Sequence, residues 1–164
     1  MLHTPCIRRL TCGFIAGLVA TTAHAADLAS RQNPAASFTV PACTFDRGNE
    51  NVRVDLVGRS VWSDTAAVLH SKIHAPTFVE YDIDFPVTAE YALSIHFAAA
   101  EARPVEVLLD GRRLATGCRD TSGGWNATHA KWEATCTLHV PHNVRTQQMR
   151  LGSSRFACLL QFEF

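Results

Sequence analysis

The sequence predicts an all-β domain, a sandwich or barrel of about nine short strands with little or no helix. Apolar and polar residues alternate along most of the chain after Ser37, as they do in strands that bury one face. Short segments rich in Gly, Pro, Asn and Asp separate these runs. No stretch of about twelve residues keeps the 3.6-residue period of an amphipathic helix.

The alternation is clearest in two consecutive runs, residues 77–85 (TFVEYDIDF) and 90–98 (EYALSIHFA). The apolar residues of each run share one face: Val79, Tyr81, Ile83 and Phe85 in the first, and Tyr91, Leu93, Ile95 and Phe97 in the second. The opposite face of the first run carries Glu80, Asp82 and Asp84, which is typical of a solvated sheet surface. Because a short connection joins the runs, we expect them to be antiparallel neighbours.

The later strands follow the same pattern. In PVEVLLDGRRLATGC, Asp110-Gly111 has the residue types of a two-residue type I′ turn, which predicts a β-hairpin. Two further strands are predicted in QQMRL (147–151) and FACLLQFEF (156–164).

In KWEATCTLHV (131–140), Trp132 and Ala134 have the same parity as Leu138. We therefore expect the Trp132 indole in the core, where its large apolar surface stabilises most. The predicted core comprises Tyr81, Ile83, Tyr91, Leu93, Ile95, Phe97, Val107, Leu138 and Phe162.

Residues 1–25 have the pattern of a signal peptide. Arg8 and Arg9 precede an apolar run, and the segment ends in the small-x-small sequence Ala23-His24-Ala25. The apolar run is far shorter than the ~20 residues that span a bilayer. We expect cleavage after Ala25 and a secreted or periplasmic product with no membrane insertion.

Residues 26–37 are polar and contain a proline, so we expect a flexible lead-in before one domain, residues 38–164. Removing the leader takes away two of the 15 basic residues and none of the 15 acidic ones, which leaves a net charge of −2. Without a basic field, neither nucleic acid nor an anionic membrane is an expected partner.

Four cysteines remain after the leader: Cys43, Cys118, Cys136 and Cys158. An even number in an exported chain favours two disulfides, for which three pairings are possible. The spacings contain no CxxC, so neither a zinc site nor a redox site is indicated.

The loop TSGGWNATHA contains a second tryptophan, Trp125, which belongs to no strand register. Gly123 and Gly124 precede it and let the backbone turn without a side-chain penalty. The ring either contacts a ligand or folds back as a plug over the end of the sandwich.

Nothing in the sequence indicates catalysis. Hydrolysis of a glycoside needs two carboxylates across a cleft, whereas Glu80, Asp82 and Asp84 form a row on one strand. The serines lack the context of a nucleophile elbow. We therefore predict that the protein is not an enzyme.

The order of these features resembles the carbohydrate-binding modules of families 6 and 35 and related galactose-binding-like jelly rolls. The similarity extends over residues 38–164, from VEYDIDFP through the DG hairpin and TSGGW to the final LLQFEF. The residues that match are Tyr81, Ile83, Phe85, Pro86, Tyr91, Leu93, Ala98, Val105, Val107, Asp110, Gly111, Gly123, Gly124 and Trp125.

The resemblance implies an antiparallel jelly-roll β-sandwich with its first and last strands side by side. It also implies a poly- or oligosaccharide ligand at the loop edge, where flat aromatic rings match the apolar face of a sugar and polar groups orient it. Trp125 corresponds to the loop tryptophan, and Trp62 is a possible second wall. Further contacts would come from Asn126, Arg103 and Arg155.

The same strand order implies two disulfides, Cys43 with Cys158 on the first and last strands and Cys118 with Cys136 across the tryptophan loop. The N-terminal E-x-E phrase, which helps to hold a structural calcium in the family, is replaced here by PACTFDRGN. We therefore expect neither calcium nor another cofactor.

A second function remains open, because a fold does not determine its ligand. The alternative is an exported β-sandwich that contacts a protein partner or has a structural role in the cell envelope, without any sugar.

Overall fold

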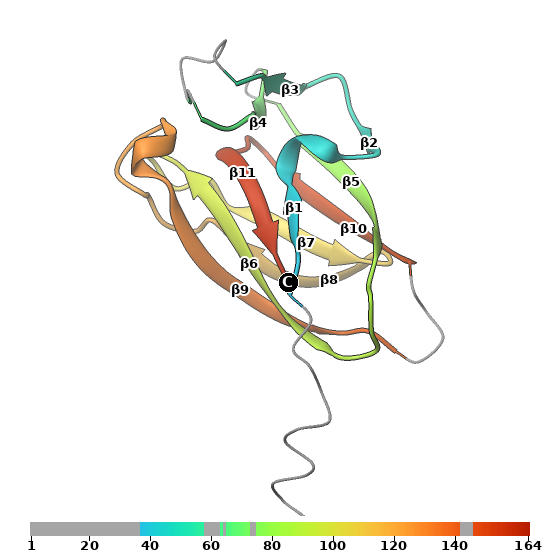
Figure 1. Ribbon diagram of the computed structural model, residues 1–164. Coiled ribbons are helices and arrows are strands. Elements are labelled where there is room, and N and C mark those ends of the chain that lie inside the picture. The colour runs from blue at the N-terminus through green and yellow to red at the C-terminus, as the bar shows by residue number, and fades with distance from the viewer. Residues whose placement is uncertain (1–36, 58–62, 64, 73–74, 142–145) are drawn as a thin grey trace, which may run out of the picture. The chain divides into compact units, whose positions relative to one another are not determined.

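Figure 1 shows a computed structural model of the protein, which describes residues 37–57, 63, 65–72, 75–141 and 146–164. The expected signal peptide (1–25), the lead-in except Ser37, and Trp62 lie outside the described residues. The described part contains no helix with the length and hydropathy that crossing a membrane requires.

The fold is a sandwich of two antiparallel sheets, which confirms the predicted class. Sheet A has the order β3 (Val52–Asp55), β4 (Val68–Ser71), β11 (Cys158–Glu163), β6 (Glu90–Ala98) and β9 (Lys131–His139), with β1 (Thr39–Pro41) paired to β11. Sheet B has the order β2 (Arg47–Gly48), β5 (Thr77–Asp84), β10 (Thr146–Ser153), β7 (Val105–Leu109) and β8 (Arg112–Gly117). The helical segments among the described residues are short 3-10 turns, η1 (Ala42–Thr44) and η2 (Ala127–His129). Figure 1 shows the sheets as two layers, with β6 and β9 in front of β7 and β8.

The core lies between the inner faces of the sheets. All nine predicted core residues are buried, with at most 4% of any of them exposed. Tyr81 of sheet B meets Phe162 of sheet A with ring centroids 5.3 Å apart, and its hydroxyl donates to the Ala42 carbonyl oxygen at 2.7 Å. The buried phenol therefore has a partner, which avoids the cost of an unsatisfied polar group.

The predicted pairing of the runs 77–85 and 90–98 is wrong. β5 belongs to sheet B and pairs with β10, whereas β6 belongs to sheet A and pairs with β11 and β9. The connection crosses from one sheet to the other, and the Tyr91 hydroxyl braces it by donating to the Val87 carbonyl oxygen at 3.0 Å. Period-two alternation shows which face is buried, but it is the same for strands side by side and strands facing each other across the core.

Two other expectations of topology are confirmed. The first and last strands are paired, with Thr39 opposite Glu163. The hairpin between β7 and β8 turns at Asp110 and Gly111, whose φ angles of 48° and 76° are both positive, as a type I′ turn requires.

A bulge in β9 overturns the prediction that Trp132 and Ala134 face the core. Leu93 pairs with Cys136 and Ser94 with Ala134, so Thr135 is an extra residue without an opposite partner on β6. Each residue of β9 before Thr135 therefore points to the opposite face from the one that simple alternation predicts. Leu138 is accordingly buried, whereas Trp132 is 43% exposed on the outer face of sheet A.

The four cysteines are thiols in the structure, with Cys118 and Cys158 buried and Cys43 and Cys136 half-buried. Burial raises the pKa of Cys158 to about 12 and also raises the pKa of Cys118 and of Cys136. Neither expected disulfide is formed here, and the pairing stays a prediction.

Candidate functional site

The tryptophan loop, residues 118–130 between β8 and β9, is fastened to the end of β6. The Thr121 hydroxyl and the Ser122 backbone N–H both donate to the Ala99 carbonyl oxygen, at 2.7 and 2.8 Å. Lys131 Nζ donates to the Thr121 carbonyl oxygen at 2.9 Å. At Gly123 the backbone has a φ of +103°, a conformation that favours glycine. The loop that carries Trp125 is therefore held in place by its own hydrogen bonds.

Trp125 is half-buried at this end of the sandwich. Its ring packs against the main core and against an outer cluster formed by Val68, Ala98 and Cys158. The guanidinium carbon of Arg103 lies 4.4 Å from the ring centroid, close enough for a cation–π contact. Arg103 thus covers part of the indole that was predicted to meet a ligand.

Three of the predicted ligand-binding residues come together here: Trp125, Arg103 and Arg155. The two arginines meet at Glu101, whose Oε1 accepts hydrogen bonds from Arg103 Nε at 2.9 Å and Nη2 at 2.6 Å, and also from Arg155 Nη2. Trp125 joins them through its contact with Arg103. The Glu101 side chain is 57% exposed, so the carboxylate stands at the surface of the cluster. Sequence reasoning missed Glu101, although its position two residues before Arg103 suggests an ion pair.

Asn126 contributes to the loop itself. Its Oδ1 accepts a hydrogen bond from the Thr128 hydroxyl at 2.5 Å and is 2.7 Å from His129 Nδ1. The His129 ring also fills the space beside Gly124, where an added Cβ would lie 2.6 Å from it. The predicted partner aromatic, Trp62, lies outside the described residues.

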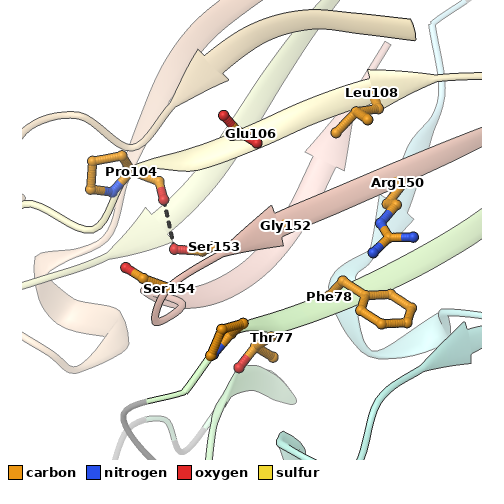
Figure 2. A pocket seen from close by; sticks show the side chains of 10 residues that line it. Thr77, Phe78, Pro104, Glu106, Leu108, Arg150, Gly152, Ser153 and Ser154 are labelled. Atoms are coloured by element: carbon orange, nitrogen blue, oxygen red, sulfur yellow. Dashed lines mark hydrogen bonds between the residues drawn. The ribbon is translucent and has the colours of Figure 1, made fainter. Parts of the chain in front are cut away.

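A second surface is an open groove of about 590 Å³ on the outer face of sheet B, over β5, β10 and β7 (Figure 2). Its lining comprises Pro76, Thr77, Phe78, Pro104, Glu106, Leu108, Arg150, Gly152, Ser153 and Ser154. Gly152 forms the floor, because it is paired with Phe78 on one side and with Glu106 on the other. An added Cβ on Gly152 would meet no atom within 4 Å, so the space above it is open.

The groove has one aromatic wall and several polar ones. Arg150 lies over Phe78, with its guanidinium carbon 3.9 Å from the ring centroid. Figure 2 shows these two residues toward one end, and Pro104, Ser153 and Ser154 toward the other. The Ser153 hydroxyl donates to the Pro104 carbonyl oxygen at 2.6 Å and so ties β10 to the start of β7.

The charges around the groove are paired with each other. Glu80 accepts from Arg150 Nη1 at 3.2 Å and from Arg47 Nε at 3.0 Å, and Glu106 accepts from Arg113 at 3.1 Å. Arg47 also binds Asp82 at 2.5 Å, and this hydrogen bond lowers the pKa of that carboxyl. Three basic residues thus meet three acidic ones, an arrangement that suits an uncharged ligand.

Sequence reasoning singled out neither Phe78 nor Gly152. Phe78 has the parity of Glu80 rather than of buried Val79, so an outward aromatic on the acidic face was a usable signal. Within the described residues, no group of three or more His, Cys, Asp and Glu side chains is placed to hold a metal ion.

Comparison with known proteins supports the fold. No protein-family model and no curated protein sequence matches the chain. Among solved structures, the C-terminal family 6 carbohydrate-binding module of the laminarinase LamC from Zobellia galactanivorans has a TM-score of 0.59 and 17% identity, covering 77% of this chain and 98% of that one. A family 35 module from Clostridium thermocellum has a TM-score of 0.59 and 14% identity, covering 78% and 98%. The fold is that of these carbohydrate-binding modules.

A similar architecture also forms part of a larger protein. The insecticidal crystal protein Cry2Aa matches 80% of this chain with 21% of its own length, at a TM-score of 0.63 and 12% identity. At these identities the similarity shows the architecture, and the ligand has to be argued from the side chains.

Proposed function

We propose that this protein is a non-catalytic, exported carbohydrate-binding module. The observation that carries the proposal is the groove on sheet B, where Phe78 stands beside an open glycine floor and faces Glu106 across it. The apolar C–H face of a sugar ring packs on an aromatic ring, and a few polar groups then fix its orientation. The fold shared with carbohydrate-binding modules supports the same function.

The groove suits a neutral poly- or oligosaccharide. Arg150 and Glu80 compensate each other, and so do Glu106 and Arg113. An acidic glycan would have to compete with these carboxylates for the arginines, whereas sugar hydroxyls can hydrogen-bond to ion-paired side chains without displacing them.

The tryptophan loop is the second surface that we propose for the same ligand class. A sugar ring would pack on the exposed part of Trp125, with Glu101, Arg103 and Arg155 binding its hydroxyls and Trp62 as a possible opposite wall. Two predicted residues, Arg103 and Arg155, converge on the exposed carboxylate of Glu101, and Arg103 also contacts Trp125, which supports this proposal.

One observation favours the alternative, a protein-interaction or envelope-structural role. Trp125 packs against two apolar clusters and is covered by Arg103, as a structural plug would be. In that case the loop would stabilise the end of the sandwich and bind no sugar.

Affinity electrophoresis in gels containing soluble β-1,3-glucan, xylan or β-mannan tests the proposed function. We expect at least one of these polysaccharides to retard the purified protein and Phe78→Ala to reduce that retardation about tenfold or more, by analogy with nucleic-acid bases that stack on aromatic side chains. Val87→Ala, an exposed apolar residue outside the groove, is the control. A parent protein that no polysaccharide retards would exclude sugar binding for this panel and favour the alternative.

A further inference from the structure

Trp132 is the described aromatic side chain with the largest exposed fraction, and it lies in neither surface described above. It stands on the outer face of sheet A and stacks on His96, with ring centroids 4.6 Å apart and an interplanar angle of 14°. His96 thus supports one side of the indole from the neighbouring strand, and 43% of Trp132 is exposed.

Strand register places Trp132 in a row that crosses the whole sheet. Residues directly opposite each other on paired strands share a face. Trp132 is opposite His96, His96 is opposite Gln161, and Gln161 is opposite Pro41. The row crosses four strands at about 4.8 Å each, so Trp132 and Pro41 stand about 14 Å apart.

A second row runs beside the first, two residues further along each strand. It comprises Ala134, Ser94, Glu163 and Thr39. All eight residues are exposed or half-buried. The second row places the small side chains of Ala134 and Ser94 beside Trp132 and His96. We call the two rows the sheet A platform.

Two bulges bring these side chains onto one face. The extra residue Thr135 turns Trp132 outward, and a second irregularity, at Leu160, sets Gln161 rather than Leu160 opposite His96. Bulges re-aim side chains and are over-represented beside functional sites.

The platform continues the surface of the tryptophan loop. Ala98 lies two residues beyond His96 on the same face of β6 and belongs to the outer cluster that Trp125 covers. Trp125 therefore covers the sheet next to the row that contains Trp132.

The side chains of the platform suit a sugar better than a protein. A stable protein interface buries about 800 Å² on each partner, with an apolar centre. Here the flat apolar side chains, Trp132 and Pro41, stand at opposite ends of their row, with Gln161 and His96 between them. The platform has one carboxylate, Glu163, and no basic side chain other than the imidazole. Burial lowers the pKa of His96, which keeps the row uncharged near neutral pH.

We propose that the sheet A platform is a further carbohydrate-binding surface, with Trp132 as its stacking ring and Gln161 as a hydrogen-bonding group, on the opposite side of the sandwich from the groove. This inference rests on the proposed function and extends it. One module would then contact two polysaccharide chains, one on each sheet.

The test uses the purified protein, its Trp132→Ala variant and the Val87→Ala control, in the same affinity gels. Trp132 is exposed, so the substitution should leave the thermal midpoint within the range of the control. We expect Trp132→Ala to weaken retardation about tenfold. We also expect Phe78→Ala to keep residual retardation that falls further in the Phe78→Ala/Trp132→Ala double variant, and Gln161→Ala to weaken binding by a smaller factor.

A second readout reports on two-sided binding. The parent protein should make solutions of long-chain polysaccharide turbid by cross-linking, and each single variant should reduce the turbidity. If Trp132→Ala is retarded as strongly as the parent, the platform is not a sugar-binding surface, whereas the proposal for the groove is unaffected. A parent that no polysaccharide retards would overturn the proposed function together with it.

Discussion

Thr135, the bulged residue of β9, lies directly against Gly117 at the end of β8. A Cβ added to Gly117 would come within 3.1 Å of both Thr135 Cγ2 and Thr135 Oγ1, and within 3.0 Å of Ile95 Cδ1. Gly117 lies on β8, an edge strand of sheet B, and has no side chain. This leaves room for Thr135, the extra residue of β9 in sheet A. The bulge that turns Trp132 to the surface therefore lies where Gly117 leaves space for Thr135.

Gly117→Ala should therefore destabilise the fold. The added methyl group presses on Thr135 and on buried Ile95, and overpacking of this kind lowers the free energy of unfolding by about 1–3 kcal/mol. Urea denaturation followed by tryptophan fluorescence measures the loss. Gly152→Ala is the matched control, since its Cβ would meet nothing within 4 Å. Equal stability of the two variants would show that the glycine is not needed for the bulge.

Gly152→Val should separate binding from stability. The side chain would project into the open groove above the floor of sheet B, where it competes with a sugar ring for the space beside Phe78. We expect an unfolding free energy within about 0.5 kcal/mol of the parent, as for most surface substitutions, with a clear loss of polysaccharide retardation. Unchanged retardation would place the ligand elsewhere.

Trp125→Ala should lower stability, because the ring packs against two apolar clusters and against Arg103. We expect a loss of about 1–3 kcal/mol, less than for a fully buried tryptophan. Binding measured well below the lowered thermal midpoint then reports on the ligand contact. Weaker binding there supports the loop site, and intact binding identifies the ring as a plug.

His96 should make stability depend on pH. Burial lowers its pKa in the folded state below the ordinary 6.5, so the unfolded chain takes up the proton more readily. The free energy of unfolding should fall as pH decreases below 6.5, and it should level off once pH is below the lowered pKa of His96 in the folded state. His96→Gln should lose this part of the slope in thermal melts between about pH 7 and pH 5. Identical slopes for both proteins would mean that the folded and unfolded pKa values do not differ.

The disulfide prediction needs a chemical measurement on protein purified without reductant. β1 pairs with β11, but Cys43 lies in the short turn η1 after β1 and not in the strand itself, whereas Cys158 begins β11. Peptide mapping without reduction should yield a Cys43–Cys158 fragment and a Cys118–Cys136 fragment. A bridge between Cys43 and Cys118, or four free thiols as in the structure, would contradict the pairing.

The sequence by itself determined which side of most strands is buried and where the tightest turn lies. Residues such as Tyr81, Ile95 and Phe97 alternate with polar neighbours, and Asp110-Gly111 tolerates positive φ. Both properties are local, because the period of two and the cost of positive φ depend on the backbone of a few consecutive residues.

Only the tertiary structure decided which strands are neighbours and where alternation breaks. β5 and β6 belong to different sheets, although nothing in their patterns distinguishes this from pairing. The candidate surfaces also join distant residues, Phe78 with Gly152 and Glu106, and Trp132 with His96 and Gln161. The position of Trp132 depends on an extra residue at Thr135 that fits because Gly117, 18 residues earlier, has no side chain. The position of Trp132 thus depends on a contact between the two sheets, which the alternation of residues within one strand cannot reveal.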